Sequence, residues 1–169
     1  MTEGVAALVA AFERIAATRM ADMPLNNPAL RVAAVGFRPW QEGTEVGVLI
    51  TPWALNLTIV CAVRDGRLRL APDRRRTWQF PSGDYDFLGG EEPECGAFQF
   101  CPLFSPTFEF RDQASAVEMG EVLVAALFAE PAGADGAARE SARLAGRSLG
   151  QVPTTRRGFL QGVFGGLKR

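Results

Sequence analysis

The amino-acid sequence predicts an α+β domain: a mostly antiparallel sheet flanked by an N-terminal and a C-terminal helix, followed by a flexible C-terminal tail. Helical periodicity of apolar residues is confined to two segments, one near each end of residues 1–130. Short runs typical of β-strands fill the interval between them, and no strand–helix–strand alternation appears. We therefore expect a body over residues 1–130, a linker over 131–153 and a tethered motif over 154–169.

The first helix is expected over residues 3–19. Thr2 can cap it, and apolar side chains from Val5 to Ala16 recur with helical spacing on one face. Two prolines in residues 24–28 then break the chain into a turn or an extended segment.

Strands dominate the central region. The 18 residues from Val46 to Val63 carry no charge, which raises the question of a membrane span. Pro52 and Asn56 near the centre of this run favour two buried strands instead, so we expect no transmembrane helix. A hairpin turn is expected at residues 64–67. The expected strands cover residues 31–37, 46–51, 55–62, 68–70, 77–80, 85–88 and 97–101.

Two further segments combine charge with turn or strand signals. Gly89 and Gly90 are expected to open an acidic loop, since five carboxylates occur between residues 84 and 94. In Phe108-Glu109-Phe110, the alternation of a strand would place both rings on one face and the carboxylate on the other.

The last helix of the body is expected from its cap, Asp112, to about Ala129. A broad apolar stripe runs along it, and Pro131 stops it. Beyond Pro131 the composition shifts to alanine, glycine, serine and arginine, which is typical of a linker rather than of a packed domain.

The composition excludes several kinds of chemistry. The chain has no histidine, so no Ser–His or Cys–His pair can form and no imidazole can bind a metal. Cys61, Cys95 and Cys101 provide neither a disulfide framework nor the spacing of a zinc or iron–sulfur site. Most of the usual groups of enzyme catalysis are therefore missing, although an enzyme stays open as an alternative. We expect no metal and no cofactor, and residence in a reducing cytoplasm.

Charge is unevenly distributed along the chain, whose formal net charge is −1. Residues 1–130 carry 11 basic and 17 acidic side chains, a net charge of −6. Residues 131–169 carry 7 basic and 2 acidic side chains, a net charge of +5. An acidic body repels nucleic acid and favours either a cationic partner or the chain's own tail.

A motif similar to a twin-arginine export signal lies in that tail. Residues 155–161 read Thr-Arg-Arg-Gly-Phe-Leu-Gln, close to the Ser/Thr-Arg-Arg-x-Phe-Leu-Lys pattern that normally stands near an N-terminus. The eight residues that follow are too few for the apolar segment of a signal. We interpret the motif as an internal imitation of a signal, in a protein that binds such signals in other chains. Its key residues are Arg156, Arg157, Phe159 and Leu160.

Several segments of the body carry a family resemblance. They are Asn27-Pro28-Ala29-Leu30, residues 35–38 with Trp40, residues 47–53 with Asn56 and Leu57, residues 81–87, 98–101 and 103–106, and residues 108–110 with 112–114. In this order they resemble the HybE/HupJ family of [NiFe]-hydrogenase assembly chaperones. An Arg-Arg-x-Phe-Leu element near the C-terminus is also familiar from this family, although Gln161 departs from the basic residue usual in export signals.

The resemblance implies a cytoplasmic, non-catalytic chaperone. Such a protein binds the precursor of the hydrogenase small subunit, including its twin-arginine signal, and contacts the large subunit, so that export waits for assembly. Two alternatives stay open: a structural or accessory subunit of the hydrogenase complex, and a small enzyme that uses a carboxylate pair or Cys101.

A site for a twin-arginine signal needs carboxylates for two guanidinium groups and an apolar slot beside them. A linker of about 24 residues has a root-mean-square span of about 27 Å, so the tail motif can reach much of its own body. We expect the motif to act as a weak internal competitor; a basic tail that aids solubility or contacts a neighbouring subunit is the alternative. The candidate carboxylates are Asp84, Asp86, Glu109 and Asp112, and the candidate slot walls are Trp40, Trp53, Phe104 and Phe108.

Overall fold

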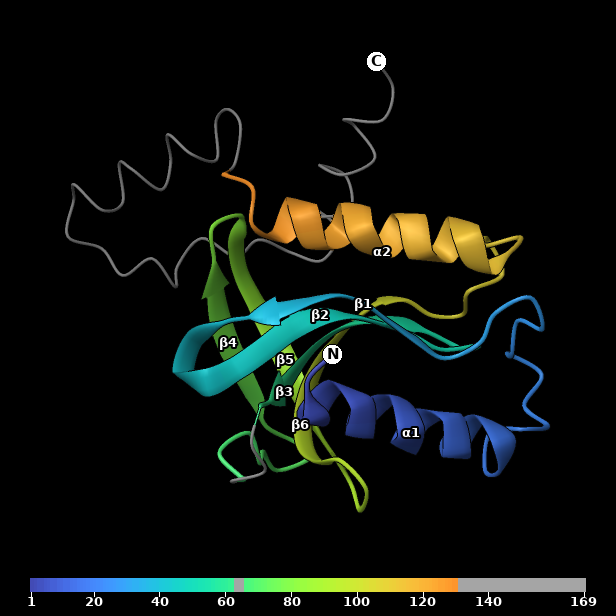
Figure 1. Ribbon diagram of the computed structural model, residues 1–169, viewed down its shortest axis with the longest axis horizontal. Helices are drawn as coiled ribbons and strands as arrows, with labels where there is room; N and C mark the ends of the chain where they lie inside the picture. The colour runs from blue at the N-terminus through green and yellow to red at the C-terminus, as the bar shows by residue number, and fades with distance from the viewer. Residues whose placement is uncertain (63–65, 131–169) are drawn as a thin grey trace.

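A computed structural model describes residues 1–62 and 66–130 of the chain. In this part of the molecule, six antiparallel strands form one sheet between two helices, one from each end of the body (Figure 1). The predicted α+β class is therefore confirmed. The predicted linker (131–153) and motif (154–169) lie outside the described residues, as do Arg64 and Asp65 of the predicted hairpin turn.

The strands follow the order β1-β2-β3-β6-β5-β4 across the sheet, and each neighbouring pair is antiparallel. Both expected helices are present, and each expected strand other than 68–70 overlaps an observed one. The elements are α1 (Glu3–Ala17), β1 (Ala33–Pro39), the 3-10 turn η1 (Gln41–Gly43), β2 (Thr44–Ile50), β3 (Leu55–Cys61), β4 (Arg75–Phe80), β5 (Gly83–Glu92), β6 (Gly96–Phe104) and α2 (Gln113–Leu127).

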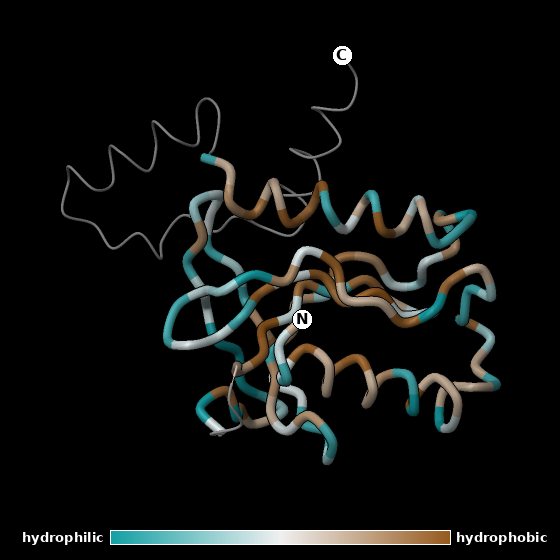
Figure 2. Tube along the Cα trace, viewed as in Figure 1, coloured by the Kyte–Doolittle hydropathy of each residue, from teal (hydrophilic) through white to brown (hydrophobic). Residues whose placement is uncertain are grey.

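Helix α1 covers one face of the sheet. Thr2 caps it, because the Thr2 hydroxyl oxygen accepts a hydrogen bond from the N–H of Val5 at 3.4 Å. Its buried side chains, Leu8 among them, pack with Val60 and Phe98 from the strands. Figure 2 shows apolar residues concentrated in the central strands and hydrophilic residues in the connecting turns.

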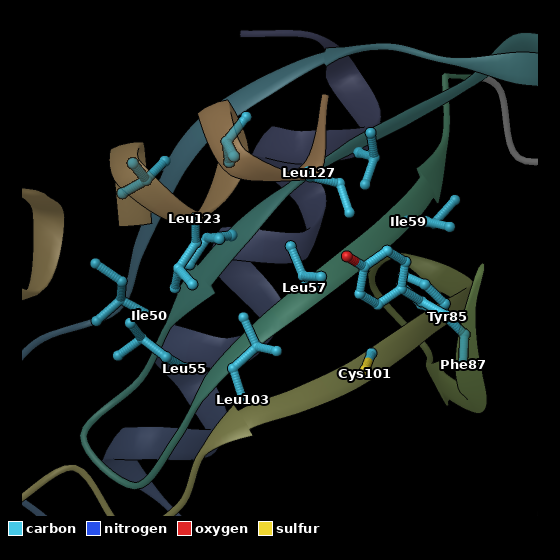
Figure 3. Packing of buried hydrophobic residues seen from close by; sticks show 14 of the residues in the cluster. Ile50, Leu55, Leu57, Ile59, Tyr85, Phe87, Cys101, Leu103, Leu123 and Leu127 are labelled. Carbon is cyan, nitrogen blue, oxygen red and sulfur yellow. The ribbon is translucent and has the colours of Figure 1, made fainter. Parts of the chain in front are cut away.

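Helix α2 covers the opposite face and closes the larger core. Leu123 and Leu127 project from it toward Leu57, and they belong to the same buried cluster as Phe87 and other side chains of the strands (Figure 3). Burying one such side chain completely stabilises the fold by roughly 1.5–3 kcal/mol. The position of α2 is thus determined by the apolar stripe that the sequence predicts.

The sheet curls around this core until its two outer parts meet. The ring of Trp40, directly after β1, stacks on Phe80 of β4 with centroids 4.9 Å apart. The Glu42 carboxylate, in the turn before β2, pairs with the Arg76 guanidinium of β4 at 3.0 Å. These contacts join strands that lie at opposite ends of the sheet order.

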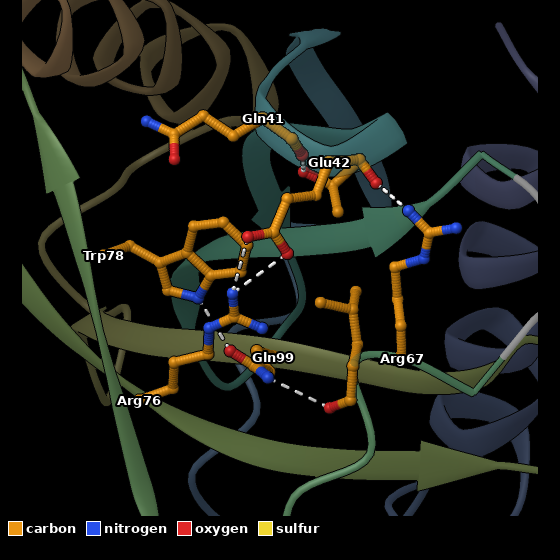
Figure 4. A network of polar contacts seen from close by, with 8 residues as sticks. Gln41, Glu42, Arg67, Arg76, Trp78 and Gln99 are labelled. Carbon is orange, nitrogen blue, oxygen red and sulfur yellow. Dashed lines mark hydrogen bonds and ion pairs between the residues drawn. The ribbon is translucent and has the colours of Figure 1, made fainter.

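A buried amide links β6 to β4 and to the segment before β4 (Figure 4). The Gln99 side chain accepts a hydrogen bond from Nε1 of Trp78 at 2.8 Å and donates one to the carbonyl oxygen of Leu68 at 3.0 Å. Because the Gln99 residue is only 1% exposed, these bonds satisfy polar groups that water does not reach.

The expectation of an acidic loop opening at Gly89 and Gly90 is wrong, because both residues lie inside β5. A Cβ atom at Gly89 would lie 2.6 Å from the carbonyl oxygen of Leu70, and one at Gly90 would lie 2.5 Å from the Phe98 ring. These glycines therefore permit close packing within a strand rather than a turn. The turn falls at residues 93–95.

Two expected strand segments are also wrong. Residues 68–70 form no strand, because the Leu68 carbonyl is bound by the Gln99 side chain rather than by a neighbouring strand. Phe108-Glu109-Phe110 is a turn, in which the N–H of Phe110 donates to the carbonyl oxygen of Thr107 at 3.1 Å. The two rings therefore do not share a face: Phe108 is 59% exposed and Phe110 is buried.

Replacing Gly4 with alanine is expected to destabilise the fold by about 1–3 kcal/mol. A Cβ atom at Gly4 would collide with the carbonyl oxygen of Cys61, so α1 would have to shift from the sheet. This effect opposes the gain of about 1 kcal/mol that alanine brings to a helix. Urea unfolding measures the change.

The matched control is Gly120→Ala in α2. A Cβ atom there would lie 3.1 Å from a methyl carbon of Val35, a side chain that can adjust, so the loss should be smaller. A Gly4→Ala protein more stable than the parent would contradict this packing of α1.

Candidate functional site

A groove of about 630 Å³ lies between α2 and the turn that follows β6. Its walls are mainly apolar, and two carboxylates stand among them. The rings of Phe104 and Phe110 meet edge to face within it, with centroids 5.3 Å apart. The groove is lined by Phe104, Glu109, Phe110, Ser115, Glu118, Met119 and Val122.

One wall of the groove is a stripe along α2. Ser115, Glu118, Met119 and Val122 follow the spacing i, i+3, i+4, i+7, which aligns side chains on one face of a helix. The neighbouring stripe, which includes Leu123, faces the core. The helix thus packs on the sheet with one stripe and lines the groove with the next.

The opposite wall is held in place by the buried amide of Asn27. Its Nδ2 donates to the carbonyl oxygens of Thr107 at 2.9 Å and Phe110 at 2.7 Å. Its Oδ1 accepts from the N–H of Ala29 at 3.0 Å. The segment before β1 therefore fixes the turn that carries Glu109.

A second connection converges on the carbonyl oxygen of Pro52, between β2 and β3. It accepts the N–H of Asn27 at 2.8 Å and the hydroxyl of Thr107 at 2.7 Å. Thr107 is fully buried. Three segments that are distant in sequence thus share one hydrogen-bonded junction behind the groove.

Asp112 lies beside the groove and caps α2. Its carboxylate accepts the N–H of Ser115 at 2.7 Å. This hydrogen bond lowers the pKa of Asp112 below its usual value, and a hydrogen bond from the Ser115 side chain has a smaller effect in the same direction. The geometry accounts for Asp112 as a helix cap.

Two of the eight predicted site residues, Phe104 and Glu109, line the groove. Phe108 adjoins Glu109 in the same turn, and its ring is largely exposed. Asp112 is exposed at the start of α2. Four of the predicted residues are thus close in the chain, in or beside this turn. Only two of them form walls of the groove.

The other four predicted residues lie elsewhere. Trp40 packs against Phe80 and Phe128. Phe128 follows the C-terminal end of α2, whereas the groove residues of α2 begin near its N-terminal end. Trp53 stacks on Phe12 of α1, with ring centroids 6.4 Å apart.

The remaining predicted carboxylates both belong to β5. Asp86 accepts a hydrogen bond from the Thr77 hydroxyl of β4 at 2.6 Å. Asp84 stands opposite Gln79 in the same pair of strands. The structure does not bring either of them to the groove lining.

The groove also contains residues outside the predicted set. Phe110, Ser115, Glu118, Met119 and Val122 complete it. The helical spacing of the last four was readable from the sequence, but the sequence also offered the core-facing stripe beside them. The stripe that lines the groove is identified by the turn packed against it. The position of that turn depends on hydrogen bonds between residues 80 or more positions apart in the chain.

Within residues 1–62 and 66–130, no group of three or more cysteine and carboxylate side chains is placed to hold a metal ion. In the same described residues, no helix is long and apolar enough to cross a membrane.

The fold and the groove define a small α+β protein with a groove that combines apolar walls with two carboxylates. The chain belongs to the family described as [NiFe]-hydrogenase assembly, chaperone, HybE, whose model matches residues 3–162. The resemblance noted in the sequence is thereby confirmed.

Individual relatives support the same assignment. Protein HoxT from Cupriavidus necator is 42% identical over 131 residues, which cover 72% of this chain and 73% of HoxT. Hydrogenase expression/formation protein HupJ from Bradyrhizobium diazoefficiens is 36% identical over 156 residues, covering 92% of this chain and 86% of HupJ. The solution structure of HybE from Escherichia coli matches with a TM-score of 0.56 and 27% identity, covering 75% of this chain and 77% of that one.

Replacing Asn27 with alanine is expected to lower the free energy of unfolding by roughly 2–4 kcal/mol, because two buried carbonyl groups lose their donor. The control is Asn26→Ala, since Asn26 donates to a single carbonyl, that of Met20. Chemical denaturation compares the two variants. Equal losses would show that the junction behind the groove contributes little.

Replacing Asp112 with alanine is expected to lower the melting temperature at neutral pH. A carboxyl whose pKa is lowered in the folded state stabilises the fold above its unfolded pKa, and this contribution is lost as pH falls through the folded pKa. The difference between parent and variant should therefore shrink in strong acid. Asp112→Asn, which keeps an acceptor but cannot titrate, should melt with less dependence on acid; identical pH profiles for all three proteins would contradict the cap.

Proposed function

We propose that this protein is a cytoplasmic, non-catalytic chaperone that binds the small-subunit precursor of a [NiFe] hydrogenase through its twin-arginine signal. The groove between α2 and the turn at residues 105–110 is the receiving site. Binding delays export until assembly is complete, and the large subunit is a second contact. The observation that carries the proposal is the pairing of Glu109 and Glu118 with apolar walls in one groove.

The chemistry of the groove matches the chemistry of the signal. The two carboxylates can each receive an arginine guanidinium, for which planar, charge-assisted hydrogen bonds are favourable. Phe104, Phe110 and Met119 offer apolar surface for the Phe-Leu pair of the signal. A site lacking either component would not distinguish this peptide from a merely basic or merely apolar one.

The expected affinity is moderate. Glu109 and Glu118 are exposed, so each ion pair contributes up to about 1 kcal/mol. Burying a Phe and a Leu side chain contributes roughly 1.5–3 kcal/mol each. These gains total at most about 8 kcal/mol before the costs of association are subtracted, so we expect dissociation constants weaker than about 1 μM. A chaperone that releases its client needs such reversible binding.

The charge of the body supports the same role. Residues 1–130 have a net charge of −6, which attracts a basic signal over distances longer than a hydrogen bond. The same charge disfavours nucleic acid as a partner. Family membership supports hydrogenase subunits as the clients.

In chains that carry Arg156→Ala/Arg157→Ala, so that the tail motif does not compete, Glu109→Gln/Glu118→Gln is expected to bind a synthetic peptide containing Ser-Arg-Arg-Asp-Phe-Leu-Lys about tenfold more weakly than the parent with the same tail, since two exposed ion pairs are lost. Raising the salt concentration should weaken the parent more than the variant. Isothermal titration calorimetry measures both effects.

Glu121→Gln is the matched control, because Glu121 is an exposed carboxylate on α2 that does not line the groove. It should bind like the parent. Equal affinities for the parent and the double variant would exclude the groove as the arginine site. Failure of a signal-bearing small subunit to co-purify better than a signal-deleted one would reject signal recognition itself.

A further inference from the structure

We infer that residues 155–161 of the chain itself occupy the groove in competition with the client signal. This inference rests on the proposed function of that groove and adds its regulation: the protein carries an internal competitor that must be displaced before a signal binds. Three independent features support it: the chemistry of the segment, its distance along the chain from the groove, and the charges of the two parts.

The segment has the side chains that the groove requires, in the order of the signal. Arg156 and Arg157 supply two guanidinium groups for Glu109 and Glu118. Phe159 and Leu160 follow after one glycine, as the apolar pair follows the arginines in an export signal. A peptide that satisfies the groove therefore already exists within the chain.

The segment is also less complete than a true signal. Gln161 stands where the export pattern has lysine, so the segment lacks one cationic side chain of a signal. This difference makes it the weaker of the two ligands. A weak ligand suits a competitor, because a strong one would exclude the client permanently.

The chain connecting α2 to the segment has a suitable length. α2 ends at Leu127, and the groove residues on it extend back to Ser115, a distance of about 18 Å along the helix axis. A flexible chain as long as the 27 residues between Leu127 and Thr155 has a root-mean-square span of roughly 26–31 Å. The segment can therefore reach the groove of its own molecule without a second copy.

Opposite charges favour the same contact. The body, at −6, attracts the tail, at +5, and the chain's net charge of −1 reflects their near cancellation. Tethering gives the segment an effective concentration on the order of 1 mM, above the concentration of any second copy in ordinary solution. Binding within one molecule is thus preferred over binding between molecules.

The size of the effect follows from these quantities. If the detached segment binds with a dissociation constant on the order of 100 μM, a tethered concentration of about 1 mM keeps the groove about nine-tenths occupied. A client signal would then bind about tenfold more weakly than it would to a groove without this competitor.

The test uses the full chain throughout. The peptide containing Ser-Arg-Arg-Asp-Phe-Leu-Lys is titrated into the parent, into Arg156→Ala/Arg157→Ala, and into Arg143→Ala/Arg147→Ala. The last variant removes the same charge from the linker and leaves the motif intact. We expect about tenfold tighter binding to the first variant and parental affinity for the second.

A second measurement needs no client. Backbone amide NMR spectra of the parent and of Arg156→Ala/Arg157→Ala should differ at Glu109, Glu118 and Met119 and agree over α1. Unchanged groove amides would overturn the inference. So would equal peptide affinities for the parent and this variant, while the proposed function would stand if Glu109→Gln/Glu118→Gln still weakened binding.

If neither the parent nor any variant binds the peptide, the proposed function is rejected. The NMR comparison would still show whether the tail segment occupies the groove. A dimer that dissociates when Arg156 and Arg157 are replaced would also overturn the inference, because the occupant would then belong to a second copy.

Discussion

The buried amide of Asn27 connects the parts of the structure on which the groove depends. Its two donated bonds hold the carbonyls of Thr107 and Phe110, and its backbone N–H and the Thr107 hydroxyl meet at the carbonyl of Pro52. The segment before β1, the turn between β2 and β3 and the turn after β6 are therefore fixed relative to one another. The junction thereby holds the turn that carries Glu109 against the sheet.

The sheet provides the second constraint. It curls so that Trp40 meets Phe80 and the carboxylate of Glu42 meets Arg76, which encloses the larger core between the strands and α2. With one stripe of α2 committed to that core, the adjacent stripe is left to line the groove. The groove is thus a by-product of how the helix closes the core, rather than an addition to the fold.

The sequence was sufficient for the fold class, because periodicity and turn residues are local signals. Thr2 and Asp112 cap their helices as expected, and the uncharged run from Val46 yields two buried strands. The prediction of a loop at Gly89 and Gly90 was wrong because glycine occurs both in turns and where a strand packs closely on its neighbours. Only the contacts with the Leu70 backbone and the Phe98 ring show that close packing applies here. For the site, Phe104 and Glu109 were found by residue type, whereas Glu118 required knowledge of which turn packs on α2.

The outer strands of the sheet have a consequence for behaviour in a crowded cell. An outer strand with unpaired backbone groups can recruit extended polypeptides, and β1 and β4 both carry features that oppose this. β1 has an irregular register between Val35 and Arg38 and ends at Pro39, while β4 begins with two arginines. These features make the two outer strands poor templates for pairing with extended segments of other chains.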